Sequence, residues 1–186
     1  MMSHRLRQLF VLATLALPFA SLAADYSVKQ PGSTLGFSDT FQGARFDGHF
    51  AKWNAAISYD PAHLSSSKFD VTVDLASAKT GDSDRDGALP GPDFFDTAKY
   101  PQAHFVTTGF HQAGGKVIAD GRLTLRGVTR PVSLTVDFKP DGSGATLDVS
   151  GTLKRLDFGV GGGQYADTSV IGADVKITAH LVLAAK

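Results

Sequence analysis

Carboxylates recur at alternate positions in one short segment, Asp82-Ser83-Asp84-Arg85-Asp86-Gly87, and Asp93 stands at the twelfth position counted from Asp82. This spacing is typical of a calcium loop, in which alternate carboxylates converge on the ion and a glycine makes a sharp turn. Pro90 and Pro92 interrupt the loop, and its last ligand would be Asp rather than the longer Glu. We therefore expect a solvated cap held by salt bridges, with calcium binding as the alternative.

Arg155 and Asp157 are the polar candidates for contact with a ligand, and Phe158 follows them directly. A guanidinium offers forked donors that suit a phosphate or a quinone oxygen, and Asp157 would fix its orientation. An Arg–Asp pair at the end of a sheet can instead be structural, and we favour that role. Arg155 and Asp157 are nevertheless candidate ligand contacts.

Other reactive residues lack the context that catalysis needs. Ser65 with Lys68 fits the S-x-x-K pattern of serine β-lactamases, and Lys79-Thr80-Gly81 fits K-T-G, but no helical domain is present to carry the serine. The histidines downstream of the N-terminal segment show neither an i, i+4 pair nor H-E-x-x-H. These are His49, His63, His104, His111 and His180. We predict no catalytic residues, no metal site and no enzymatic activity.

Alternating apolar and polar residues indicate that most of the chain is β-strand. Turn residues such as Asp60-Pro61 and Pro140-Asp141-Gly142 separate the strands. The predicted strands are 26–30, 33–38, 46–59, 68–76, 102–110, 116–126, 132–139, 145–154 and 170–184. Eight or nine strands with short antiparallel connections predict a sandwich or a closed barrel.

Two of these strands form a predicted hairpin whose apolar residues all lie on one face. If Leu125 faces Val132, then Leu123 faces Leu134, with Gly127 and Pro131 in the turn between them. A hairpin with one apolar face and one polar, solvent-exposed face predicts an antiparallel sheet that surrounds an apolar interior. Within 46–59 the apolar residues change from even positions (Phe46, Phe50) to odd positions (Trp53, Ile57), which predicts a bulge or bend near Ala51.

The segment 80–101 breaks the strand rhythm. It is polar at first and then rich in Pro, Gly and Phe, so we expect a loop with one or two short helical turns. A loop of this length usually serves as a lid, a cap or a binding loop. Phe94 and Phe95 make it the candidate rim of a binding site.

The N-terminus predicts export from the cytoplasm. Arg5 and Arg7 precede an apolar run that ends in small residues, which is the pattern of a secretory signal peptide over 1–23, cleaved after Ala23 or Ala24. The sequence has no cysteine, so it lacks a lipoprotein anchor. The sequence has 18 basic and 18 acidic residues and no block of basic residues, so its charge does not indicate binding to nucleic acid.

Four stretches of the sequence resemble the YceI-like family of exported, lipocalin-like polyisoprenoid-binding proteins. They are FDVTVDLASAKTGDSDRDGAL, PDFFDTAKYPQAHF, GRLTLRGVTRPVSL and LKRLDFGVG, in the order of the family. One departure is Thr34-Leu35, where many members have His-Ser. The resemblance implies that 24–186 is one all-β domain, a single antiparallel eight-stranded barrel with a long loop or short helix over one end.

The resemblance also implies a function. It predicts a periplasmic protein that carries or stores an isoprenoid lipid, either a quinone tail such as that of ubiquinone or a polyprenyl phosphate. No cofactor besides that lipid is expected, and a membrane cytochrome b561-type protein is an implied partner. The oligomeric state stays open, a dimer included. The alternatives are a packed barrel without lipid that serves as a stress-response or interaction module, and an enzyme acting on a quinone or prenyl substrate.

An eight-stranded barrel can be filled by its own side chains or can hold one small ligand. The candidate ligand contacts are therefore the inward-facing apolar residues, the rim and the polar pair at the barrel end. They are Phe37, Phe46, Phe50, Trp53, Phe69, Val71, Val73, Phe94, Phe95, Phe105, Leu123, Leu125, Leu134, Val136, Arg155, Asp157 and Phe158.

Overall fold

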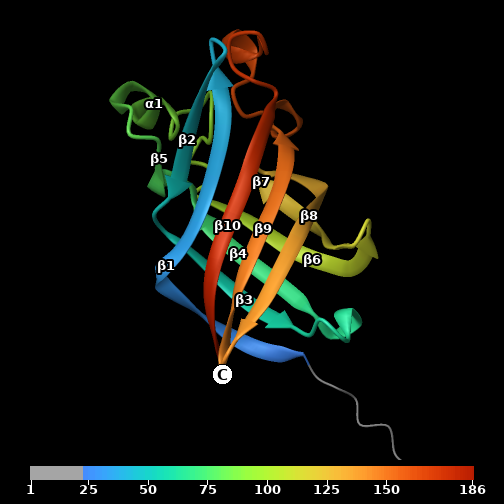
Figure 1. The fold of residues 1–186 in the computed structure, drawn as a ribbon. Helices are drawn as coiled ribbons and strands as arrows, with labels where there is room; N and C mark the ends of the chain where they lie inside the picture. Colours follow the sequence, from blue (N-terminus) through green and yellow to red (C-terminus); the bar gives the residue numbers. More distant parts are fainter. Residues whose placement is uncertain (1–22) are drawn as a thin grey trace, which may run out of the picture.

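The computed structural model describes residues 23–186, so the signal-peptide prediction falls outside the described residues except at its boundary. Ten strands account for most of this part of the chain (Figure 1). They are β1 Ala24–Phe41, β2 Ala44–Phe50, β3 Trp53–Tyr59, β4 Lys68–Asp74, β5 Ala78–Lys79, β6 Gln102–Ala113, β7 Lys116–Leu125, β8 Val128–Asp141, β9 Gly144–Lys154 and β10 Asp174–Ala185. The helical elements are short: η1 Leu64–Ser66, η2 Leu75–Ser77, α1 Ser83–Ala88, η3 Arg155–Phe158 and η4 Gly163–Tyr165. Within this range no helix has the length and apolar character needed to cross a membrane.

The strands form a closed antiparallel barrel, as predicted. The first strand, β1, pairs with β10 along most of its length and with β3 near its start, which closes the ring β1-β3-β4-β6-β7-β8-β9-β10. The two extra strands, β2 and β5, extend the wall at one end, where β2 pairs with the second half of β1. Figure 1 shows α1 and the segment between β9 and β10 at this same end, and the C-terminus at the other.

The first two predicted strands are one continuous strand, which corrects the sequence analysis. Pro31-Gly32 makes a bulge in β1 rather than a turn. Lys29 pairs with Val182 and Thr34 pairs with His180, so β1 has extra residues between these two positions. The left-handed conformation of Gly32 accommodates the irregularity without ending the strand.

The register predicted for the central hairpin is wrong. Leu125 pairs with Val128, not Val132, because Arg126 and Gly127 both adopt positive φ and close a two-residue turn. Two positive φ values in succession give the type of turn whose twist matches that of antiparallel strands. Strand β8 therefore begins four residues earlier than predicted, and Pro131 lies within it, opposite Arg122.

The other predicted strands are close to those observed, with two informative differences. The predicted strand 46–59 is divided at Ala51-Lys52, where the parity of its apolar residues changes, and its halves β2 and β3 pair with different neighbours. The last strand begins at Asp174, because residues 155–173 fold over the end of the barrel instead. The loop predicted over 80–101 contains the single short helix α1, as expected.

The barrel interior has two distinct halves. In the packed half, buried side chains of β3, β4 and β7–β10 form a continuous core. Its members are Ala55, Ile57, Tyr59, Phe69, Ala119, Val136, Ala145, Leu147, Leu181 and Leu183. In the cavity half, at the end that carries β2, β5 and α1, a second cluster surrounds a hollow. Its members are Phe37, Leu75, Ala78, Leu89, Phe95, Ala103, Phe158 and Val160.

Candidate functional site

An apolar cavity of about 690 Å³ occupies the cavity half of the barrel. Its wall is made by residues of β1, β2, β4, β6, β7, β9 and β10, and two covering segments, 75–95 and 155–171, supply the remainder. Alternation within each strand directs every second side chain into the barrel, so the wall is almost wholly hydrophobic. A preformed apolar cavity of this size is typical of a site for a small or elongated hydrophobic ligand.

Aromatic rings line one side of the cavity without filling it. The ring of Phe37 packs against that of Phe50 with centroids 5.2 Å apart, and Phe50 packs against Phe95 at 6.1 Å. Gly48, opposite Phe37 on β2, leaves the space in which the Phe37 ring lies, since a Cβ at this position would overlap the ring. A side chain at position 48 would therefore push the Phe37 ring towards the cavity.

The segment between β5 and β6 and the segment between β9 and β10 cover the cavity, and they contact each other. The ring of Phe94 packs on that of Tyr165 at 5.0 Å, and the backbone N–H of Gly161 donates to the carbonyl of Asp93 at 2.8 Å. Arg126, in the β7–β8 turn, donates to the carbonyls of Pro92, Asp93 and Gly159. The covering segments are therefore held by the barrel wall as well as by each other.

Arg155 has a structural role, but its partners are not those that the sequence suggested. Its five N–H donors have five backbone acceptors, the carbonyls of Val160, Gly161, Tyr165, Ile171 and Gly172. Burial lowers the pKa of the guanidinium, and the neighbouring Asp39 opposes this shift. The side chain thus holds residues 160–172 in place, and its donors are occupied by the protein itself.

Asp157 does not pair with Arg155, which corrects the expected ion pair. It is exposed, and its backbone carbonyl accepts a hydrogen bond from Nε of Arg130 at 3.4 Å. The short helix η3 begins at Arg155, so residues two positions apart in it do not share a face. Asp157 therefore does not line the cavity.

Apart from Arg155, whose donors are occupied by the backbone, the charged side chains that line the cavity come from the end of β1, the start of β2 and the start of α1, and we take this side as the mouth of the cavity. Arg45 and Arg85 contribute positive charge there, and Asp39, Asp82 and Asp84 contribute negative charge. The guanidinium carbon of Arg85 lies 4.1 Å from the centroid of the Phe46 ring. Burial raises the pKa of Asp39, opposed by the backbone N–H of Thr40 and by Arg155.

The structure gathers ten of the predicted ligand contacts around the cavity. They are Phe37, Phe46, Phe50, Val73, Phe94, Phe95, Leu123, Leu125, Arg155 and Phe158. Four others belong to or pack against the packed half: Trp53, Phe69, Val71 and Val136. Phe105 pairs with Leu123 of the cavity lining and with Val71, and Leu134 pairs with Ala119 of the packed half, but neither residue lines the cavity.

Several cavity residues escaped the sequence analysis. They are Leu75, Leu89, Ala103, Leu153, Val160, Tyr165, Ile171, Val175 and Ile177, together with the charged residues of the mouth. Val175 and Ile177 share the alternating face that continues to Leu181 and Leu183, so strand parity could have found them. Ile171 falls in the predicted strand 170–184 with the same parity, so alternation could have found it too, whereas Tyr165, in η4, carries no such signal.

In the segment 82–87, for which calcium binding was the alternative to a solvated cap, two of the aspartates bond to nearby residues. Asp82 caps α1 by accepting from the backbone N–H of Arg85 at 2.9 Å, and Asp86 accepts from both N–H and Oγ1 of Thr80. Their carboxylates thus serve the local fold instead of converging on one point. Across residues 23–186 no group of three or more His, Cys, Asp or Glu is placed to hold a metal ion.

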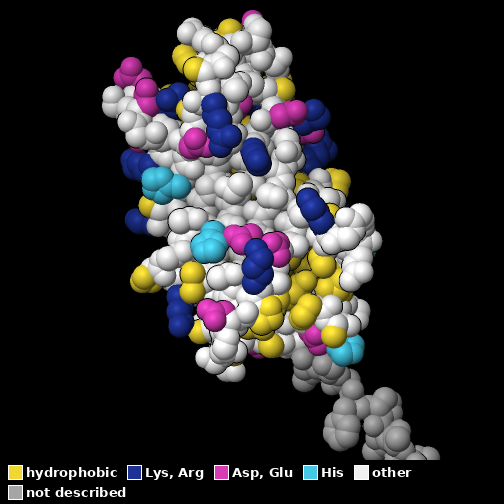
Figure 2. Space-filling model, in the orientation of Figure 1, with side chains coloured by type: hydrophobic (Ala, Val, Ile, Leu, Met, Phe, Trp, Pro, Cys, Tyr) yellow, Lys and Arg dark blue, Asp and Glu magenta, His cyan; other side chains and the backbone are white. Residues whose placement is uncertain are grey.

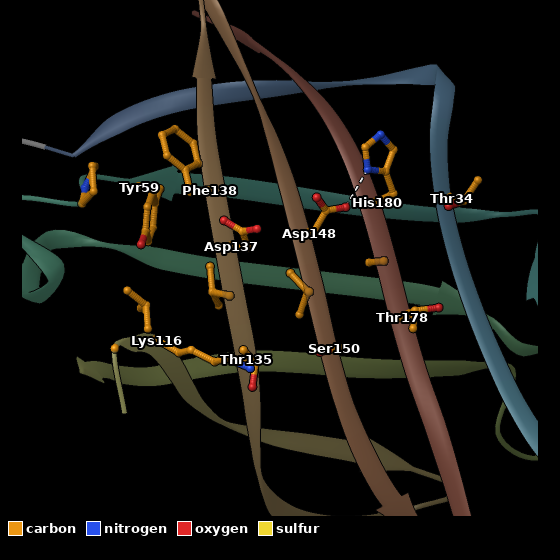
Figure 3. Close-up of a pocket in the computed structure, with 16 residues that line it drawn as sticks. Thr34, Tyr59, Lys116, Thr135, Asp137, Phe138, Asp148, Ser150, Thr178 and His180 are labelled. Carbon is orange, nitrogen blue, oxygen red and sulfur yellow. Dashed lines mark hydrogen bonds and ion pairs between the residues drawn. The ribbon is translucent and has the colours of Figure 1, made fainter. Parts of the chain in front are cut away.

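A second hollow, of about 710 Å³, is lined mainly by residues of β8, β9 and β10, together with Thr34, Tyr59, Pro61 and residues 115–117. Figure 3 shows Asp137, Asp148 and His180 side by side on these strands, with Nδ1 of His180 2.6 Å from Oδ1 of Asp148. The side chains of His180 and Asp148 are nearly half exposed, so water screens the interaction between them. Figure 2 shows acidic, basic and His side chains interspersed on this face of the molecule. We therefore assign the candidate site to the apolar cavity.

Comparison with known proteins identifies what this chain is similar to. Residues 26–183 match the model of the YceI-like domain. A UPF0312 protein of Pseudomonas syringae pv. tomato is 35% identical over 167 residues, covering 81% of this chain and 87% of that protein. Protein YceI of Escherichia coli O157:H7 is 32% identical over 163 residues, covering 78% and 85%.

Solved structures share the fold. BcnA of Burkholderia cenocepacia superposes with a TM-score of 0.80 at 33% identity, covering 84% of this chain and 99% of that chain. A polyisoprenoid-binding domain from Saccharophagus degradans, implicated in plant cell wall breakdown, superposes with a TM-score of 0.67 at 18% identity, covering 88% and 99%. At that identity the second likeness concerns the fold alone.

Proposed function

This chain belongs to the YceI-like family, and on that premise we propose that its cavity binds the hydrocarbon chain of an isoprenoid lipid. One observation carries the proposal: the barrel holds an apolar cavity beneath its extra elements, and apart from Arg155, whose donors are occupied by backbone carbonyls, its charged groups lie at the mouth. Such an arrangement suits a ligand with a long apolar tail and a polar head. The Saccharophagus domain, described as polyisoprenoid-binding, has the same fold.

Burial of the tail alone would give strong binding. Each isoprene unit removed from water contributes about 3–4 kcal/mol, at about 0.8 kcal/mol per carbon. Ordering the flexible chain costs part of this, about 0.5–1.5 kcal/mol per immobilised group by analogy with side chains. Several units together therefore outweigh the cost of association, and the ligand needs few polar contacts.

Among the two head groups that the family resemblance suggests, the mouth favours an uncharged quinone over a phosphate. The donors of Arg155 are taken up by carbonyls, and Arg45 is paired with Asp47 at 2.6 Å. Arg85 lies 3.5 Å from Asp82, with Asp84 also at the mouth. A phosphate would thus meet carboxylates and cations that already have partners, whereas a neutral ring brings no charge to compensate.

We further propose that the protein carries or stores this lipid in the periplasm and exchanges it with a membrane protein of the cytochrome b561 type. The signal-peptide pattern of the sequence supports the location, and β1 begins at Ala24, directly after the first proposed cleavage position. The absence of cysteine is compatible with a protein that is released rather than anchored by a thioether. The work is binding rather than catalysis.

Native mass spectrometry of protein purified from periplasm without detergent, followed by solvent extraction, tests the proposal. We expect a stoichiometric adduct that yields an isoprenoid quinone on extraction. A polyprenyl phosphate in the extract would retain the lipid and reject the quinone. A mass that stays bare after incubation with both lipids would refute lipid binding and favour a packed interaction module.

A further inference from the structure

Exposed large hydrophobic side chains are concentrated at one end of the barrel. Within residues 23–186 they are Phe41, Leu156 and Val170, with exposed fractions of 43%, 38% and 39%. Phe41 ends β1, Leu156 lies in η3, and Val170 lies between η4 and β10. Among the described residues, large exposed hydrophobics therefore occur at the end that carries the cavity and not at the opposite end.

Two of these side chains, Phe41 and Val170, come from segments that lie side by side. Phe41 forms a backbone bridge with Ile171, and the N–H of Gln42 donates to the carbonyl of Val170 at 2.7 Å. Figure 1 shows the β1–β2 turn beside the segment between β9 and β10 at the extreme end of the barrel. We call residues 40–44 and 168–171 the tip.

The tip presents apolar groups both at the cavity and outside it. Phe41 and Ile171 line the cavity, although Phe41 is also exposed to solvent. Val170, the residue next to Ile171, does not line the cavity and exposes its side chain to solvent instead. A flat protein surface would cover one side of such a tip, whereas a fluid bilayer surrounds all of it.

The tip is also uncharged, and backbone groups around Val170 have partners. Residues 40–44 and 168–171 contain no Asp, Glu, Lys, Arg or His. The N–H of Val170 donates to the carbonyl of Asp167 at 3.2 Å, and the N–H of Gly172 donates to the carbonyl of Thr40 at 3.0 Å. Charged groups and unpaired backbone groups are what make insertion into a bilayer unfavourable. Insertion of the tip therefore meets little of either cost.

We propose that the tip inserts into the surface of a lipid bilayer, so that an isoprenoid tail moves along Phe41 from the bilayer into the cavity without crossing water. This inference rests on the proposed function, because it describes how the same cavity is loaded. The apolar area favours a bilayer over a protein partner. The exposed part of Phe41 is about 90 Å², whereas a stable protein interface buries about 800 Å² on each partner. One or two apolar side chains suit the weak, reversible membrane contact that lipid exchange needs.

A fluorescent label in the tip tests the contact directly. The chain has no cysteine, so Thr168→Cys gives a single attachment site for an environment-sensitive dye on an exposed residue. Added vesicles of phosphatidylethanolamine and phosphatidylglycerol should increase and blue-shift its emission. Ser143→Cys is the matched control and should not respond, since Ser143 is exposed in the β8–β9 turn, where its carbonyl accepts from the N–H of Ala185 near the C-terminus.

Val170→Asp separates loading from binding, because Val170 does not line the cavity. The variant removes an apolar contact and adds a charge, so it should weaken vesicle binding and slow the transfer of ubiquinone from vesicles, each about tenfold. Its affinity for ubiquinone delivered from cyclodextrin, measured by native mass spectrometry, should equal that of native protein.

Leu156→Asp is the matched control for this variant. Leu156 is about as exposed as Val170, but it lies by β8, where the carbonyl of the next residue, Asp157, accepts from Arg130. In the ring of strands, β9 and β10 separate β8 from β1. Leu156→Asp should therefore slow transfer from vesicles by less than about threefold.

The outcomes separate the tip from the proposed function. A silent label at position 168, with equally fast transfer from vesicles to native protein and to Val170→Asp, would overturn the bilayer contact and leave lipid binding intact. A dimer that Val170→Asp disrupts, without vesicle binding, would assign the tip to a second copy of this chain and overturn the inference too. Failure to take up ubiquinone from cyclodextrin, together with bare protein from periplasm, would instead refute the proposed function, whatever the label reports.

Discussion

The same barrel strands run through both halves of the barrel, yet only one half contains the apolar cavity. In the packed half, the rings of Tyr59, Phe69, Phe110 and Phe138 interlock with centroids 4.8–6.0 Å apart. In the cavity half, the aromatic rings line one side of the wall. The packed half therefore supplies a continuous core, and the other half has room for a ligand.

The two halves are also held together differently. The packed half depends on apolar contacts between strands, whereas the covering of the cavity half depends on hydrogen bonds from Arg126 and Arg155 to backbone carbonyls. Substitutions in the two halves should therefore have different effects on stability and on ligand binding.

Arg155→Met should have the largest effect. It removes five charge-assisted hydrogen bonds and leaves buried carbonyls without donors, so we expect a loss of about 4 kcal/mol or more, concentrated in residues 155–173. Hydrogen exchange should show this segment opening while the packed half stays protected. Arg130→Met is the control, since Arg130 makes a single long bond to the Asp157 carbonyl and its loss should change stability by less than about 0.5 kcal/mol. Equal effects of the two variants would contradict the role assigned to Arg155.

A matched pair of Leu→Ala substitutions compares the halves directly. Leu147 is fully buried in the packed half, so Leu147→Ala should cost about 3–5 kcal/mol in urea unfolding, because the cavity it leaves cannot collapse. Leu123 already borders empty space and loses fewer contacts, so Leu123→Ala should cost only about 1–2 kcal/mol. Only Leu123→Ala should weaken binding of ubiquinone. Equal losses of stability would mean that the cavity half is packed too.

Gly48→Ala should narrow the cavity from the β2 side. The new methyl group overlaps the Phe37 ring, which must move towards the cavity, at a cost of about 1–2 kcal/mol. The affinity for ubiquinone should fall, as measured by native mass spectrometry of the delipidated protein titrated with this lipid. Gly109→Ala is the control, since a Cβ there meets no other atom. Unchanged affinity in Gly48→Ala would remove Phe37 from the ligand site.

Asp39→Asn should have the smallest effect, and its sign depends on pH. Burial raises the pKa of Asp39 in the folded protein, so its ionisation opposes folding once the pH has risen above the ordinary value of 3.8. The variant should therefore be slightly more stable than native protein at pH 7 and should lose this advantage below about pH 4. Thermal unfolding at both values measures the difference. A less stable variant at pH 7 would show that the attraction of Arg155 for the carboxylate outweighs its burial.

Strand alternation predicted most of the fold, because period-two patterns decide which residues face the interior. It missed the Arg126-Gly127 turn, since a positive φ at a non-glycine residue leaves no mark in the sequence, and Pro131 suggested a turn where a strand runs. The family resemblance supplied the closure into eight strands that alternation alone left open.

The candidate site was harder to predict than the fold. Alternation places Trp53 and Phe37 alike in the interior, but the tilt and stagger of the strands decide which half each one enters, and neither is encoded in parity. The acceptors of Arg155 could not be predicted either, since they are backbone carbonyls of an irregular segment.

Methyl NMR of the delipidated protein titrated with ubiquinone would show whether only the cavity half binds the ligand, because it reports on both halves in one experiment. The account predicts large shifts at the methyl groups of Leu123, Val175 and Ile177, which line the cavity, and little change at Leu147, Leu181 and Leu183 of the packed half. Shifts spread evenly over both sets, or confined to the packed half, would contradict it.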